Sequence, residues 1–343
     1  TQMTARNRIL LAFLAVATVV LFVVHLAVGS VAIPIGEVWR GLWNVSGADE
    51  SMLLIVRNFR LPKAVMALLA GAALSTVGLQ MQTLFRNPLA GPYVLGVSSG
   101  ASLGVSIMLL GLPLLGISTS NPIVQNIGVA GAAWIGSALI MVVVMAVTTR
   151  IKNIMTVLIL GMMFGSAASA LVEIMQYLSP EGALKSYVVW TMGSLGGVTL
   201  SQLWIVVPVI VVGLVISVLL IKPLNILLLG ENYARTMGLN IRRTRLLVTL
   251  TTVLLAGTVT AYCGPIGFVG LAVPHVARML FREADHRVLV PSTMLCGTTI
   301  MLLCDIASSL PSSDLALPIN TVSALVGIPI VVIVIFRNRK MMM

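Results

Sequence analysis

Long runs of apolar residues, separated by short polar segments, dominate this sequence. Of its 343 residues, 58% are hydrophobic and 9% are charged, whereas a soluble domain carries about 25% charged residues. Many of the runs approach the ~20 residues that a helix needs to cross about 30 Å of hydrocarbon. A membrane β-barrel would show alternating segments of about ten residues instead. The chain is therefore predicted to be an all-α, polytopic membrane protein.

About ten runs are long enough to be transmembrane helices. The expected spans are 9–29, 61–81, 93–112, 127–148, 154–178, 203–221, 246–262, 264–281, 289–306 and 318–337. An even number of spans places both termini on one side, and Lys and Arg gather in cytoplasmic segments. The 21 basic residues follow this rule, because only five of them fall in segments expected outside: Arg40, Arg57, Arg60, Lys63 and Lys185. Both termini are therefore predicted to be cytoplasmic, and residues 1–343 to form a single transmembrane domain.

The net charge of +11 is explained by this topology and does not require a nucleic-acid partner. Most of the basic residues expected outside lie within 40–63, just before the second span. They could anchor the chain to lipid phosphates, or they could meet a protein partner.

The stretch RNPLAGPYVLGVSSGAS (86–102) interrupts the apolar pattern most sharply. Asn87-Pro88 and Gly91-Pro92 cannot continue a helix, so the chain is expected to turn here. The serines that follow give the third span a face of small residues. The stretch GMMFGSAASA (161–170) does the same for the fifth span. Such faces allow close helix packing or line a wide passage.

The segment 222–245 is the longest and most polar cytoplasmic loop. Its ENYARTMG portion is expected to form a short helix that ends at Gly238, and NIRRTR a second helix with Asn240 as its cap. A further pattern, LLAG followed by a glycine seven residues later, occurs in 68–78 and in 254–264. These two spans run in opposite predicted directions, which suggests an inverted repeat.

Several catalytic motifs are missing from the sequence. It contains no GxxxxGK[ST] and no HExxH, so a self-contained ATPase or zinc protease is not expected. Cys263, Cys296 and Cys304 lie in apolar segments without a CxxC pair and are interpreted as small buried thiols. No catalytic residue and no metal ligand is predicted.

Ionisable residues inside the membrane are few: His25, Glu173, His275, Arg278 and Asp305. Glu173 is the best candidate for a residue on a transport pathway, and a partnered carboxylate near the interface is the alternative. His25 is expected to be a satisfied core histidine. His275 and Arg278 are expected to cap a helix or contact a loop. A carrier driven by an ion gradient would usually need more carboxylates in its spans.

Three stretches resemble a known family: RLPKAVMALLAGAALSTVGLQMQTLFRNPLAGPYVLGVSSGAS, LLLGENYARTMGLNIRRTR and GPIGFVGLAVPHVARML with DHRVLVPST. They are similar to the FecCD and BtuC type of permease, which serves ABC importers for ferric siderophores, haem and cobalamin. The resemblance runs in order along nearly the whole chain. It implies the type II importer permease fold in the cytoplasmic (inner) membrane of a bacterium or archaeon.

The resemblance also implies partners. These are a second copy of the permease or a related permease, a dimer of ATPase subunits that carries ATP and Mg, and an extracytoplasmic substrate-binding protein. The missing phosphate-binding loop fits this arrangement, because ATP would be hydrolysed on another chain. The chain itself is then a transport subunit and not an enzyme, and no cofactor is expected on it.

Site residues follow from the same resemblance. The segment 222–245 matches the helices that contact the ATPase, with Glu231, Ala234, Arg235, Gly238 and Leu239 as the coupling residues. Arg60 and Lys63 match positions that dock the binding protein, and Arg57 is a nearby third candidate. Two positions depart from the family pattern, because Ser309 stands where an arginine is common and Asn320 replaces a glycine.

The expected function is that of a permease which moves a large iron chelate by alternating access. Ferric siderophore is the first expectation for the cargo, haem the second and cobalamin the third. Residues expected to line the pathway are Ser98, Ser99, Ser102, Met162, Gly165, Ser166, Ser169 and Glu173. The alternatives are a secondary transporter driven by an ion gradient and a purely structural membrane subunit.

Overall fold

The structure is a computed structural model that describes residues 3–29, 34–43, 50–117, 122–148, 154–309 and 317–339. Every regular element in these ranges is a helix. Within these ranges, eight helices are long and apolar enough to cross a membrane, and Phe268–Phe281 and Ile319–Ile333 are shorter apolar helices. Each of the ten predicted spans has a helical counterpart, which confirms the all-α membrane fold. Arg150, Lys152 and Lys340, predicted to be cytoplasmic, lie outside the described residues.

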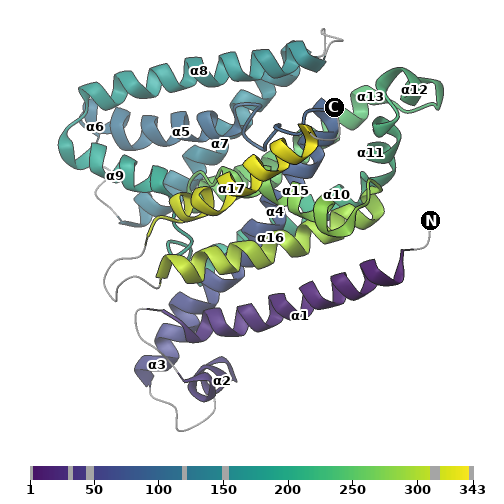
Figure 1. Cartoon of the computed structure of the whole chain (residues 1–343). Coiled ribbons are helices and arrows are strands. Elements are labelled where there is room, and N and C mark those ends of the chain that lie inside the picture. Colours follow the sequence, from purple (N-terminus) through teal and green to yellow (C-terminus); the bar gives the residue numbers. More distant parts are fainter. Residues whose placement is uncertain are drawn as a thin grey trace. The chain divides into compact units, whose positions relative to one another are not determined.

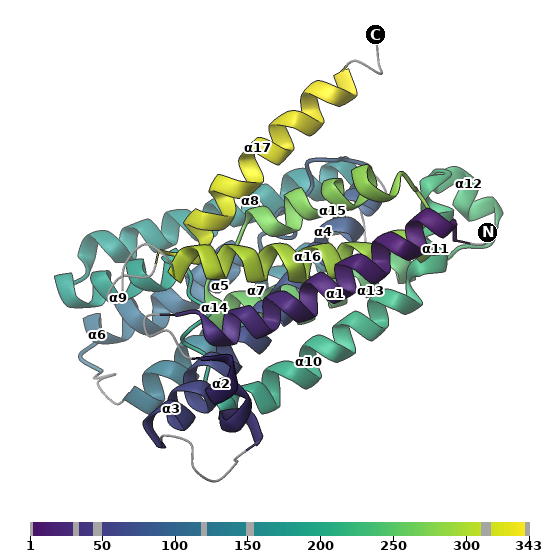
Figure 2. The same cartoon turned by 60° about the horizontal axis from the view of Figure 1, so that its bottom comes forward.

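The chain divides into two compact units. Unit 1 comprises Thr1–Leu79, Ser194–Pro208 and Phe268–Met343. Its elements are α1 (Ala5–Ala27), α2 (Ile35–Trp43), α3 (Glu50–Ile55), the π-helical turn Val56–Arg60, α4 (Leu61–Phe85) as far as Leu79, the start of α10 (Leu200–Leu219), α15 (Phe268–Phe281), α16 (His286–Ser309) and α17 (Ile319–Arg339). Figures 1 and 2 both show α1 beside α16, and α15 packs against α16 and α17.

Glycines bring the backbones of unit 1 into direct contact. A Cβ atom on Gly71 of α4 would overlap the carbonyl of Gly297 on α16, and one on Gly297 would overlap the carbonyl of Gly71. A Cβ atom on Gly78 would overlap the carbonyl of Gly270 on α15. Between these contacts, the Ser75 hydroxyl lies 3.0 Å from the Thr293 carbonyl oxygen, to which it donates. Such small residues are typical of close helix packing in membranes.

Unit 2 comprises Gln80–Gly193 and Val209–Gly267. Its elements are the end of α4, α5 (Val97–Ser106), the π-helical turn Ile107–Gly111, α6 (Leu112–Leu114), α7 (Pro122–Thr148), α8 (Ile154–Leu178), α9 (Glu181–Met192), the end of α10, α11 (Ile221–Leu228), α12 (Glu231–Thr236), α13 (Ile241–Thr252), the π-helical turn Val253–Gly257 and α14 (Thr258–Cys263). Helix α5 packs against α7 and α8 (Figure 1). Gly100 of α5 and Gly136 of α7 face each other so closely that a Cβ atom on either would overlap the carbonyl of the other.

Segments that were assigned to the same side of the membrane contact each other within each unit. In unit 1, the Arg6 guanidinium donates to the Phe281 carbonyl oxygen at 2.8 Å. In unit 2, the Arg86 guanidinium donates to the Leu228 carbonyl oxygen at 3.2 Å. Both contacts join segments predicted to lie on the same side of the membrane; that this side is the cytoplasm remains a prediction.

The predicted inverted repeat remains a prediction. Gly71 lies in a backbone-to-backbone contact, whereas a Cβ atom on its counterpart Gly257 would meet only side chains at 3.7 Å or more. The two LLAG segments therefore pack differently. The single-domain prediction likewise remains a prediction.

Candidate functional site

A groove of about 720 Å³ lies in unit 2 between α8 and the segment that leads into α5. Its lining residues are Tyr93, Val94, Gly96, Ser99, Gly161, Met162, Gly165, Ser166, Ser169, Ala170 and Glu173. Six of the residues predicted to line the pathway are among them. Ser98 and Ser102 are not, and the hydroxyl of Ser102 is paired with that of Tyr187 on α9.

Glycines explain why α8 lies so close to the start of α5. Gly96 has a φ of +81°, a backbone conformation that glycine adopts without steric cost. A Cβ atom at this position would lie 3.3 Å from the carbonyl oxygen of Gly161 and 3.6 Å from the Cα of Gly165. The turn therefore presents its backbone to α8, and the groove is walled by small residues.

The groove offers little for tight binding of a polar ligand. Glu173 is the one carboxylate among its lining residues. The Ser166 hydroxyl donates to the Met162 carbonyl oxygen of its own helix at 3.0 Å, so it already has a partner. Half-exposed Met162 adds a flexible, polarizable surface. Such a lining suits passage of a bulky solute better than its retention.

The predicted coupling segment forms helices α11 and α12, seen together near α13 in Figure 1. Gly238 follows α12 with a φ of +81°, and the Leu239 amide donates to the Ala234 carbonyl oxygen at 3.0 Å. This is the usual way in which a glycine ends a helix. The Asn240 side chain accepts from the Arg243 amide at 3.0 Å and caps α13. The short helix, its end and the cap were all predicted correctly.

One detail of the prediction needs correction. NIRRTR is not a separate short helix, because α13 continues without a break from Ile241 to Thr252; the second short helix of the segment is α11. A Cβ atom on Gly238 would meet nothing within 4 Å in the described residues. The positive φ angle is what favours glycine at this position.

The five predicted coupling residues differ in their exposure. Arg235 and Gly238 are exposed, Glu231 and Leu239 are half-buried, and Ala234 is buried. The carboxylate of Glu231 forms an ion pair of 2.5 Å with Arg245 of α13. Two exposed residues were not among the predicted site residues. Tyr233 lies on α12 and is 58% exposed, and Met237 follows the helix directly and is 55% exposed. An aromatic residue and a methionine within the otherwise polar stretch ENYARTMG are a signal that could have identified them.

The three predicted docking residues lie in unit 1 and have different environments. Arg57 is exposed, whereas Arg60 is buried. The guanidinium of Arg60 donates to the carbonyl oxygens of Leu26 and Ala27, both at 2.8 Å. Arg60 thus holds the end of α1 in place, and its charge faces inward.

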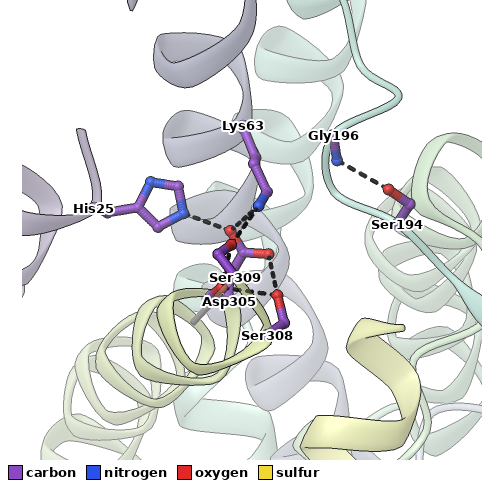
Figure 3. A network of polar contacts seen from close by, with 7 residues as sticks. All are labelled: His25, Lys63, Ser194, Gly196, Asp305, Ser308 and Ser309. Carbon is purple, nitrogen blue, oxygen red and sulfur yellow. Dashed lines mark hydrogen bonds and ion pairs between the residues drawn. The ribbon is translucent and has the colours of Figure 1, made fainter. Parts of the chain in front are cut away.

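Half-buried Lys63 belongs with buried His25 and Asp305 to an ionic cluster, which we define as these three residues (Figure 3). The Asp305 carboxylate lies 3.0 Å from the Lys63 ammonium and 2.5 Å from the Nε2 atom of His25. The Lys63 ammonium also donates to the Ser309 hydroxyl at 3.2 Å. As predicted, His25 is a core histidine and its Nε2 atom is paired, but its buried Nδ1 atom has no hydrogen-bond partner among the described residues. Ser309, the departure from the family pattern, contributes a contact inside this cluster.

Comparison with known proteins identifies relatives along the whole chain. The model of the FecCD transport family matches residues 17–337. The hemin transport system permease protein HmuU of Yersinia pestis is 32% identical over 97% of this chain and 97% of its own length. The vitamin B12 import system permease protein BtuC of Klebsiella pneumoniae is 35% identical over 97% of this chain and 95% of its own length.

A solved structure also matches the fold. It is an inward-facing conformation of a metal-chelate type ABC transporter, with a TM-score of 0.82 and 30% sequence identity. The match covers 95% of this chain and 98% of the solved chain.

Proposed function

This chain belongs to the FecCD transport family and is the membrane-spanning permease of an ABC importer; we propose that its cargo is a large metal chelate. Ferric siderophore is the first candidate, haem the second and cobalamin the third. The groove in unit 2 is the observation that carries this proposal. Its volume of about 720 Å³ lies within the ~300–1,000 Å³ range of pockets for small organic ligands. The side chains that line it are mostly small and weakly polar.

The groove is proposed to be the translocation pathway of this chain. Ser99, Met162, Gly165, Ser166, Ser169 and Glu173 line it. Weak holding is useful in such a pathway, because cargo that is released readily can leave when the pathway opens to the other side. A substrate-binding protein would supply the affinity for the cargo.

The α11–α12 segment is proposed to receive the ATPase. It combines exposed Arg235 with the exposed apolar side chains of Tyr233 and Met237, a mixture that is typical of protein interfaces. The sequence has no phosphate-binding loop, so ATP and Mg would be held by the partner chain. This segment is assigned to the cytoplasm together with both termini.

Arg57 is proposed to be the main docking contact for the binding protein. It is exposed on the π-helical turn Val56–Arg60, whereas the charges of Arg60 and Lys63 have partners within unit 1. Charged contacts of this kind chiefly set the rate and orientation of docking. The functional assembly is proposed to hold two copies of this permease or one copy and a related chain.

A secondary transporter driven by an ion gradient has little support in the described spans. Their two carboxylates are Glu173 and Asp305. Asp305 is already paired with Lys63 and His25, which leaves Glu173 alone to couple an ion.

Uptake into proteoliposomes tests the proposal. The liposomes would hold this chain with its co-purified ATPase, and binding protein loaded with radiolabelled ferric siderophore, haem or cobalamin would be added outside. Uptake that requires ATP inside the liposomes is the expected result, and the accepted label identifies the cargo. Uptake driven by an ion gradient without ATP, in a preparation that binds no ATPase, would contradict the proposal.

A further inference from the structure

The segment 86–96, which we call the linker segment, touches both the coupling helices and the groove. We propose that Arg86 positions the junction of α11 and α12, and that the linker segment carries movement of this junction to the groove wall. The inference rests on the proposed function, in which α11 and α12 receive the ATPase. All of the contacts involved lie within unit 2.

The Arg86 guanidinium lies at the end of α11. Its Nη2 atom donates to the carbonyl oxygen of Leu228, the last residue of that helix, at 3.2 Å. The final carbonyl groups of a helix lack partners within the helix and carry partial negative charge, so a cation is stabilising there. Arg86 therefore binds α11 at the point where the chain turns toward α12.

Gly230 completes this junction. It precedes α12 with a φ of +110°, and a Cβ atom there would lie 3.1 Å from Nη2 of Arg86. The Gly230 carbonyl oxygen accepts from the Ala234 amide at 2.8 Å in the first turn of α12. The guanidinium thus lies against the residue that starts α12. On the other side of the segment, Glu231 is paired with Arg245 of α13.

The backbone of Arg86 indicates that its side chain matters. Its φ is +48° directly after α4 ends at Phe85. Glycine or asparagine takes this left-handed conformation at lower steric cost and is the usual residue at the end of a helix. An arginine at this position needs a compensating contact, and the bond to α11 is such a contact.

The rest of the linker segment is built to be stiff. The Asn87 side chain accepts from the Leu89 amide at 2.9 Å, and the Ala90 amide donates to the Asn87 carbonyl oxygen at 3.1 Å. Pro88 and Pro92 fix two further backbone angles. Ala90 and Leu95 are buried. A segment of successive turns with two prolines and buried anchors transmits displacement better than a flexible loop does.

The far end of the linker segment is anchored beside the groove. The Tyr93 hydroxyl accepts from the Ile266 amide at 3.2 Å and lies 3.3 Å from the Thr260 hydroxyl. Tyr93, Val94 and Gly96 all line the groove. A shift of the α11–α12 junction would therefore reach the groove wall through eleven residues of continuous, turn-rich chain.

The variant Arg86→Gly separates the two roles that Arg86 could have. Glycine relieves the positive φ angle, so a residue that only ends α4 could be replaced without loss. A positioning residue could not be replaced in this way, because the contact to α11 would be removed. Arg282→Gly is the matched control, since Arg282 is the other non-glycine residue with a positive φ, at +53°, within the described part of the chain.

The readout is the reactivity of a cysteine introduced by Ser169→Cys, toward a water-soluble maleimide. The three native cysteines are buried, so the background is low. The permease–ATPase complex would be labelled without nucleotide and with Mg-ATP plus vanadate. We expect the nucleotide to change the labelling rate in the parent protein and in Arg282→Gly, and Arg86→Gly to lose this change while it still binds the ATPase.

The outcomes separate the inference from the proposed function. A nucleotide response of parental size in Arg86→Gly would overturn the inference. No response in the parent protein, although the ATPase is bound, would contradict the proposed function itself. If Arg86→Gly fails to bind the ATPase, Tyr93→Phe tests the other end of the linker segment. Loss of the response in Tyr93→Phe would support the inference, and a parental response would overturn it.

Discussion

The ionic cluster of His25, Lys63 and Asp305 turns its charges inward, whereas the coupling segment around α12 leaves most of its polar side chains exposed. His25 and Asp305 are 5% and 2% exposed. In the coupling segment Arg235 is exposed, and so are the apolar residues Tyr233 and Met237 beside it. Charges that are neutralised within the chain serve its folding, and charges that remain exposed are available to a partner. Four substitutions test this difference, and we order them by the loss of stability expected.

Asp305→Ala is expected to have the largest effect on stability. Removing one partner of a buried ion pair costs about 3–5 kcal/mol, because the remaining charge stays buried without compensation. The midpoint of thermal unfolding in detergent measures the loss. The double variant Lys63→Met/Asp305→Leu removes both charges and should lose less. An Asp305→Ala protein as stable as the parent would show that the cluster does not serve folding.

Gly238→Val is expected to have an intermediate effect. The φ of +81° costs a residue with a side chain about 1–2 kcal/mol, and a β-branched residue lies at the upper end of this range. Gly238→Asn is the control, because asparagine tolerates this conformation. ATP-dependent uptake should fall in the valine variant and persist in the asparagine variant. Equal uptake in both variants would contradict a role for the backbone conformation.

Glu231→Gln is expected to lower stability only slightly. Its ion pair with Arg245 is partly exposed to solvent, and exposed pairs contribute about 0.2–1 kcal/mol. A double-mutant cycle with Arg245→Gln, followed by thermal unfolding, isolates this contribution. A loss as large as that of Asp305→Ala would contradict the distinction between the two regions.

Arg57→Glu is expected to leave stability nearly unchanged, within about 0.5 kcal/mol, as is usual for exposed positions. It should nevertheless weaken stimulation of the ATPase by the binding protein, most strongly at low salt. Lys185→Glu, at another exposed basic residue predicted to lie outside, is the control. Stimulation that falls equally in both variants would indicate a general charge effect instead of a docking site at Arg57.

Local features of the fold could be predicted from the sequence because they depend on residues that are close in the chain. The apolar runs predicted the spans, and the glycine and asparagine around residue 240 predicted the end of α12 and the start of α13. Six of the residues predicted to line the pathway do line the groove, since small residues at helical spacing mark the face along which α8 and the start of α5 approach each other. The resemblance of the chain to the FecCD and BtuC type of permease supplied the functional context.

The sequence by itself determined the membrane class, the helical spans and the local caps, because hydrophobicity and backbone preference act over a few residues. Only the tertiary structure decided which side chains are free to act. It joined Asp305 to His25 and Lys63, which lie about 240 to 280 positions earlier in the chain, and it turned Arg60 inward onto α1. It also joined Arg86 to Leu228, 142 positions later. Such pairings depend on how helices pack, and packing brings together residues whose separation in the sequence carries no signal.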